Sequence, residues 1–148
     1  MCIRDRYNIA VGYDALSSST TGTSNVAVGA QSLNSNTTAN YNVAIGRRAM
    51  SSNTTGGGNV AIGSSSLSDN TTGDYNVAVG MSALNSNTTG DNNVAIGGTV
   101  LNYNSTGSRN IAIGYLAYKA ADTENDNLAI GYNALRVSIA GGEYNVAI

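Results

Sequence analysis

The stretch that decides the fold is Asn42–Gly46, which reads Asn-Val-Ala-Ile-Gly and returns 17 residues later as Asn59–Gly63. The same interval separates eight successive asparagines, from Asn8 to Asn127, and a glycine closes each motif four positions later. Alternating β-branched residues bounded by Asn and Gly are typical of a short strand. Because the interval does not slip, we expect each motif to belong to one structural unit that stacks on the next.

A second apolar position follows each glycine, as at Leu67 and Leu84, and then comes a polar turn such as Asn87-Thr88-Thr89-Gly90. The segment between the glycine and this turn is too short to form a stable helix, so we predict a second short strand there. Two strands and two turns per 17 residues make one coil of a parallel β-solenoid. The chain is therefore predicted to be all-β, with eight such coils.

Stacked coils place like residues in columns about 4.8 Å apart. We predict that the β-branched residues form the dry interior, closed from the opposite wall by the leucines; these core positions are Val26, Val28, Val43, Ile45, Val60, Ile62, Leu67 and Leu84. The asparagine at each strand start can form an amide ladder of the kind that stabilises stacked β structure. The predicted ladder comprises Asn25, Asn42, Asn59, Asn76, Asn93 and Asn110.

The middle residue of every strand motif is alanine, and alternation turns it away from its β-branched neighbours. This column comprises Ala27, Ala44, Ala61, Ala78, Ala95 and Ala112. Two interpretations stay open. The alanines form a subunit interface that lets another β surface approach closely, or they only fit a tight outer face.

The two ends of the chain depart from the repeat. Residues 1–6, Met-Cys-Ile-Arg-Asp-Arg, are similar to the in-frame translation of a transposase adapter used in sequencing libraries, and we interpret them as an artefact. The last motif stops at Ile148, one residue before the expected glycine. We therefore expect residues 7–148 to be one solenoid domain, cut from a longer repeat at both ends.

The recurring Asn-Val-Ala-Ile-Gly string, at Asn42–Gly46, Asn59–Gly63 and Asn93–Gly97, resembles the head repeat of YadA-like trimeric autotransporter adhesins. The resemblance covers residues 7–148. It implies a left-handed parallel β-roll, association into a homotrimer, a place at the bacterial cell surface on an outer-membrane anchor, and attachment to host matrix or to a cell-surface ligand. This chain departs from that family in its longer coil, which carries an additional Asn-Thr-Thr-Gly turn.

Composition narrows the function further. The chain has no His, and its carboxylates lie in predicted turns, so we expect no catalysis and no cofactor or metal. The net charge of −2 argues against nucleic-acid binding, and no apolar run is long enough to span a bilayer.

Our main hypothesis is a structural and adhesive segment of a trimeric surface fibre. Similar Asn-Thr-Thr-Gly repeats in phage tail fibres and marine bacterial surface proteins leave a virion fibre as one alternative. The second alternative is an ice-binding solenoid, suggested by threonine pairs such as Thr88-Thr89 that recur in successive coils.

Overall fold

The computed structural model describes residues 7–120, 122–137 and 141–148. These residues contain one strand per coil and no helix; the strands are β1 (Ile9–Val11), β2 (Val26–Val28), β3 (Val43–Ile45), β4 (Val60–Ile62), β5 (Val77–Val79), β6 (Val94–Ile96), β7 (Ile111–Ile113), β8 (Leu128–Ile130) and β9 (Val146–Ala147). The predicted β-solenoid is confirmed, with its coils 17 residues apart.

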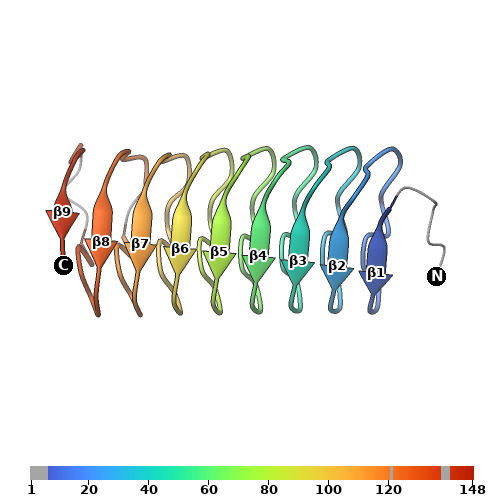
Figure 1. Ribbon diagram of the computed structural model, residues 1–148, viewed down its shortest axis with the longest axis horizontal. Coiled ribbons are helices and arrows are strands. Elements are labelled where there is room, and N and C mark those ends of the chain that lie inside the picture. Colours follow the sequence, from blue (N-terminus) through green and yellow to red (C-terminus); the bar gives the residue numbers. More distant parts are fainter. Residues whose placement is uncertain (1–6, 121, 138–140) are drawn as a thin grey trace.

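All nine strands form one parallel sheet in sequence order, from β1 to β9. Like residues pair in every step, so that Val43 lies beside Val60 and Ala44 beside Ala61. Only the last step is longer, because Leu128 pairs with Val146. Figure 1 shows the strands on one side of the roll with the return segments behind them, and this course makes the coil left-handed.

The second wall of each coil is not a strand, so the second strand that we predicted is wrong. Leu67 and Ser65, for example, have φ values of 50° and 56°, which lie in the left-handed region and interrupt extended backbone. The wall still bonds to its neighbours: the amide of Leu67 donates to the carbonyl of Ala83 at 3.0 Å, and that of Ser65 to the carbonyl of Arg47 at 2.9 Å. Stacking therefore satisfies this backbone without a regular strand.

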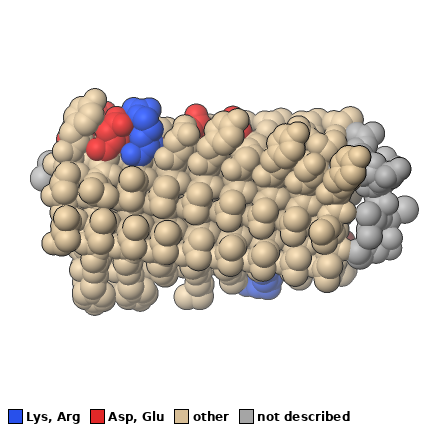
Figure 2. Space-filling model, viewed as in Figure 1, with Lys and Arg blue, Asp and Glu red and all other residues tan. Residues whose placement is uncertain are grey.

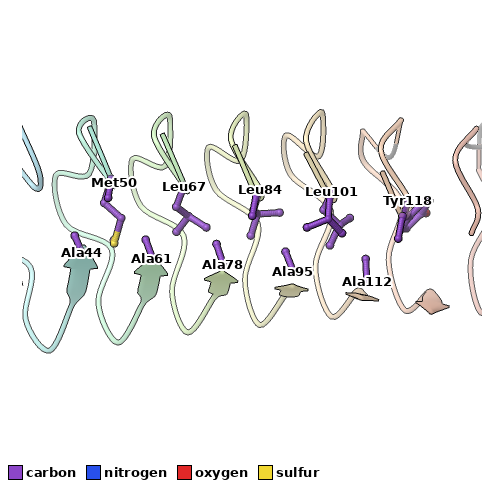
Figure 3. Close-up of a cluster of buried hydrophobic side chains, with 14 of the residues drawn as sticks. Ala44, Met50, Ala61, Leu67, Ala78, Leu84, Ala95, Leu101, Ala112 and Tyr118 are labelled. Carbon is purple, nitrogen blue, oxygen red and sulfur yellow. The ribbon is translucent and has the colours of Figure 1, made fainter. Parts of the chain in front are cut away.

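The interior is narrow and holds one large apolar residue in most coils, while the coil of β6 holds two, Val100 and Leu101. Figure 3 shows Ala61 and Ala78 pointing from their strands toward Leu67 and Leu84 on the opposite wall. These four residues are fully buried, and so are their counterparts Ala27, Ala44, Ala95, Ala112, Leu33, Met50 and Leu101. Leu67 and Leu84 are thus correctly predicted core residues.

The orientation that we predicted for the strands is wrong. The alanine of each strand faces the interior, whereas the β-branched residues on either side face outward; this corrects the assignment of Val26, Val28, Val43, Ile45, Val60 and Ile62 to the core. The alanine column Ala27, Ala44, Ala61, Ala78, Ala95 and Ala112 is 0% exposed and cannot form a subunit interface. A thin coil has room for alanine opposite leucine, but not for two more β-branched residues.

Candidate interaction face

The outward side of the sheet is made of apolar side chains alone. We call this surface the strand face; it consists of Ile9, Val11, Val26, Val28, Val43, Ile45, Val60, Ile62, Val77, Val79, Val94, Ile96, Ile111, Ile113, Leu128 and Ile130. Ile45, Ile62 and Ile96 are 39%, 38% and 39% exposed although each has a neighbour on both sides in its column. A sheet with one solvated face ordinarily alternates apolar with polar residues, and this sheet does not.

The strand face also lacks charge. Figure 2 shows that the Lys, Arg, Asp and Glu side chains visible from this side lie along the upper and lower margins, and that the middle of the face has none. Contiguous exposed apolar patches larger than a few hundred Å² are rare on soluble monomers and mark interaction sites. The strand face is therefore the strongest candidate site among the described residues.

Two further columns border the strand face, one on each side. The leading margin, which precedes the asparagine of each coil, consists of Tyr7, Ser24, Tyr41, Gly58, Tyr75, Asn92, Arg109 and Asp126. The trailing margin, which follows the glycine, consists of Tyr13, Ala30, Arg47, Ser64, Met81, Gly98, Tyr115 and Tyr132. The tyrosines of both margins are more than half exposed, so these margins enlarge the surface that a partner could cover.

The predicted asparagine ladder is confirmed, and it fixes the edge from which each strand starts. The Oδ1 of Asn42 accepts hydrogen bonds from the backbone amide of Asn59 at 2.9 Å and from its Nδ2 at 3.2 Å. The Nδ2 of Asn42 donates to the carbonyl of Gly56 at 2.9 Å. All six ladder residues, Asn25, Asn42, Asn59, Asn76, Asn93 and Asn110, are fully buried. Each amide thus ties its own coil to the next.

A second buried ladder, which we did not predict from the sequence, is formed by Asn36, Asn53, Asn70, Asn87 and Asn104. Asn70 Nδ2 donates to Asn53 Oδ1, and Asn70 Oδ1 accepts from Asn87 Nδ2, both at 2.8 Å. Asn70 Nδ2 also donates to the carbonyl of Gly73 at 3.0 Å. The strict recurrence of these asparagines could have revealed the ladder, but their Asn-Thr-Thr-Gly context is typical of an exposed turn.

The second ladder ends at Asn104, whose Oδ1 is buried and has no hydrogen-bond partner within the part of the chain that the structure describes. Position 121 holds alanine, which carries no amide to continue the column. In the same coil Tyr118 replaces the core leucine, and its hydroxyl lies 2.7 Å from Asn127 Nδ2, which donates to it. The polar interior is therefore reorganised near the C-terminal end.

In the threonine pairs Thr54-Thr55 and Thr71-Thr72, the first hydroxyl is hydrogen-bonded to the backbone of the next coil and the second residue faces solvent. Thr54 and Thr71 are partly buried, and Thr54 Oγ1 donates to the carbonyl of Thr71 at 3.0 Å. The following residues, Thr55 and Thr72, are exposed. The hydroxyl of Thr54 is thus bonded within the stack, and only the second threonine of each of these pairs faces solvent.

One ion pair marks the leading margin. Arg109 donates from Nε to Asp126 Oδ1 at 2.7 Å and from Nη2 to Oδ2 at 2.8 Å. These hydrogen bonds to the Arg109 guanidinium lower the pKa of the Asp126 carboxyl below its ordinary value. Because both groups lie at the surface, the pair contributes to the charge pattern of the margin more than to stability.

The described residues contain no group of His, Cys, Asp or Glu that could hold a metal ion. No helix suited to crossing a membrane occurs in residues 7–120, 122–137 and 141–148. Residues 1–6, which we interpret as an artefact, lie outside the described part of the chain. No family model matches this chain, and neither a curated protein nor a solved structure matches it.

Proposed function

We propose that this chain is a structural and adhesive segment of a fibre in which three copies pack their strand faces together. The observation that carries the proposal is the composition of the strand face: every outward position of β1 to β8 is Val, Ile or Leu. Covering these side chains removes apolar surface from water, at roughly 25 cal/mol for each Å² buried.

The length of the face suits such an interface. Eight coils at about 4.8 Å each give a length of about 38 Å, along which each coil contributes two outward apolar residues. A second copy of this chain offers a surface of the same length, the same coil spacing and the same absence of charge.

The number three and the adhesive role rest on the resemblance of the repeat to adhesin heads. A fibre on the outer surface of a bacterial cell, with matrix or cell-surface ligands, is the form that this resemblance favours. Repeated copies would then give avidity without any catalytic residue. A virion fibre would use the same packing, so we expect the same assembly whether the fibre belongs to a cell or to a virion.

The mass of the assembly tests the proposal. We expect sedimentation equilibrium to give three times the 15.0 kDa mass of the chain. Ile62→Glu places a charge at the middle of the strand face and should yield the monomer mass without loss of β structure by circular dichroism. Thr72→Glu, on an exposed site away from that face, should leave the assembly intact. A parent chain that sediments as a monomer, or an Ile62→Glu variant that still forms trimers, would contradict the proposal.

A further inference from the structure

We propose that the copies lie parallel and in register, and that the leading margin of one copy clasps the trailing margin of its neighbour at every second coil. This inference rests on the proposed assembly and specifies how its margins meet. It starts from an alternation that both margins share. Tyr75 and Met81 flank β5, whereas the smaller Gly58 and Ser64 flank β4. Tyr75 and Met81 are 68% and 63% exposed, so neither side chain is used by the core.

The same alternation extends along most of the roll. The coils of β1, β3, β5 and β7 carry bulky residues on both margins; the pairs are Tyr7 with Tyr13, Tyr41 with Arg47, Tyr75 with Met81, and Arg109 with Tyr115. The coils of β2, β4 and β6 carry small or short residues on both; these pairs are Ser24 with Ala30, Gly58 with Ser64, and Asn92 with Gly98.

Packing within one chain explains why each margin alternates. A Cβ added to Gly58 would lie 2.7 Å from Cδ1 of Tyr75, and one added to Gly98 would lie 3.2 Å from Cδ2 of Tyr115. Each ring therefore leans over the preceding coil and needs a small residue beneath it. One bulky residue covers two coil levels in this way, which leaves no uncovered gap between successive clasps.

Packing within one chain does not explain why the two margins share the same phase. The margins lie beyond opposite ends of each strand, since Tyr75 precedes β5 and Met81 follows it, with the three strand residues Val77–Val79 between them. Between parallel copies related by rotation, however, the leading margin of one meets the trailing margin of the next. Copies that run in opposite directions across a two-fold axis would instead bring a margin against its own counterpart.

The chemistry of the pairs favours contact at the same coil level. Tyr41 would meet Arg47 as a cation–π pair, and Arg109 would meet Tyr115 in the same way with the roles reversed. Tyr75 would meet the thioether of Met81, a favourable sulfur–aromatic contact. Tyr7 and Tyr13 would form an aromatic pair. A shift of one coil would set most of these bulky residues against small ones; Tyr75, for example, would meet Ser64 or Gly98.

In the coil of β8 the trailing margin departs from the alternation, because the bulky Tyr132 stands where a small residue is expected, whereas Asp126 on the leading margin is as short as Asn92. Asp126 bonds back to Arg109 through the bidentate ion pair, and Tyr132 stacks on Tyr115 with ring centroids 6.1 Å apart and planes 16° apart. Both margins thus pair along the chain at this level.

Cross-linking between copies tests the register. In a Cys2→Ser background, Tyr75→Cys with Met81→Cys places thiols on the two margins at one coil level. Tyr75→Cys with Ser64→Cys reports a shift of one coil in one direction, and Tyr41→Cys with Ser64→Cys reports the opposite shift. We expect a short bifunctional thiol reagent to give severalfold more covalent dimer and trimer for the first pair than for either shifted pair. Tyr75→Cys alone should give little product, because antiparallel packing is the arrangement that would join it to itself.

The outcomes separate this inference from the proposed function. Each variant is first sedimented without reagent. A monomer mass would overturn both the assembly and the clasp. An intact trimer whose shifted pairs cross-link as well as or better than Tyr75→Cys with Met81→Cys, or whose Tyr75→Cys variant cross-links strongly alone, would overturn the clasp and leave the assembly standing.

Discussion

Removal of one amide from the second ladder should destabilise the fold strongly. Asn70→Ala deletes two donated hydrogen bonds, to Asn53 Oδ1 at 2.8 Å and to the Gly73 carbonyl at 3.0 Å, and one accepted from Asn87 Nδ2 at 2.8 Å. At about 1 kcal/mol for each bond the loss is about 3 kcal/mol. The carbonyl of Gly73 keeps a second donor, Asn59 Nδ2 at 2.9 Å, so it does not add to the cost.

The acceptor left behind adds to this loss. Asn53 Oδ1 is fully buried and would lose the amide that now donates to it, which costs about 1–3 kcal/mol. We therefore expect Asn70→Ala to lower the free energy of unfolding by about 4–6 kcal/mol, a large part of the stability of an ordinary domain. Asn70→Asp keeps the shape but loses the donor and buries a carboxylate, so its effect should be at least as large.

Equilibrium unfolding in urea, followed by far-ultraviolet circular dichroism at one fixed protein concentration, measures this effect. Thr72→Ala is the matched control, because Thr72 lies two residues away and its side chain is exposed. It should stay within about 0.5 kcal/mol of the parent chain. If Asn70→Ala stayed that close as well, the ladder would contribute nothing to stability and this reasoning would be refuted.

Three further predictions follow from the backbone, the core and the margin. Gly63→Ala should lower the free energy of unfolding in urea by about 2 kcal/mol or more, because φ is +132° and the new Cβ would lie 2.5 Å from a carbonyl oxygen of the next coil. Gly57→Ala, at a position with more space and no positive φ, should lower it much less. Ala78→Val should lower stability by about 1–3 kcal/mol, since Ala78 is fully buried against the opposite wall; unchanged stability would mean that the alanine faces outward. The lowered pKa of Asp126 means that its pairing with Arg109 stabilises the fold at neutral pH and that this contribution is lost as the pH falls through the folded-state pKa; carboxyl titration by nuclear magnetic resonance should show that pKa rising toward its ordinary value in Arg109→Gln.

The period and the coil architecture could be predicted from sequence because Asn42–Gly46 recurs without a slip. The sidedness of the strands was also present in the sequence. Asn25 directly precedes β2 and Ala27 is the middle residue of that strand, so the two are two residues apart and point to the same side. A buried asparagine ladder therefore required a buried alanine. The preference for placing larger apolar residues inside gave the opposite answer, because it took no account of how little room a 17-residue coil encloses.

The backbone conformation of the second wall and the location of the strand face could not be obtained from periodicity and residue propensity. A positive φ at Leu67 is uncommon for such a residue, and propensity alone favours a strand there. It is imposed by the tight return of the chain and by bonds to the coils on each side. The strand face could be recognised only from the structure, because its residues were the ones that we predicted to lie in the core.

The most direct test of the account is whether the strand face of one copy contacts that of another. A trimer assembled from two differently isotope-labelled pools of chain allows methyl contacts between copies to be separated from those within a copy. We predict intermolecular contacts from the methyl groups of Ile45, Ile62 and Ile96, and none from the core residues Leu67 and Leu84. Intermolecular contacts that avoid the isoleucines and arise instead from other surfaces would contradict the claim that the strand face joins the copies.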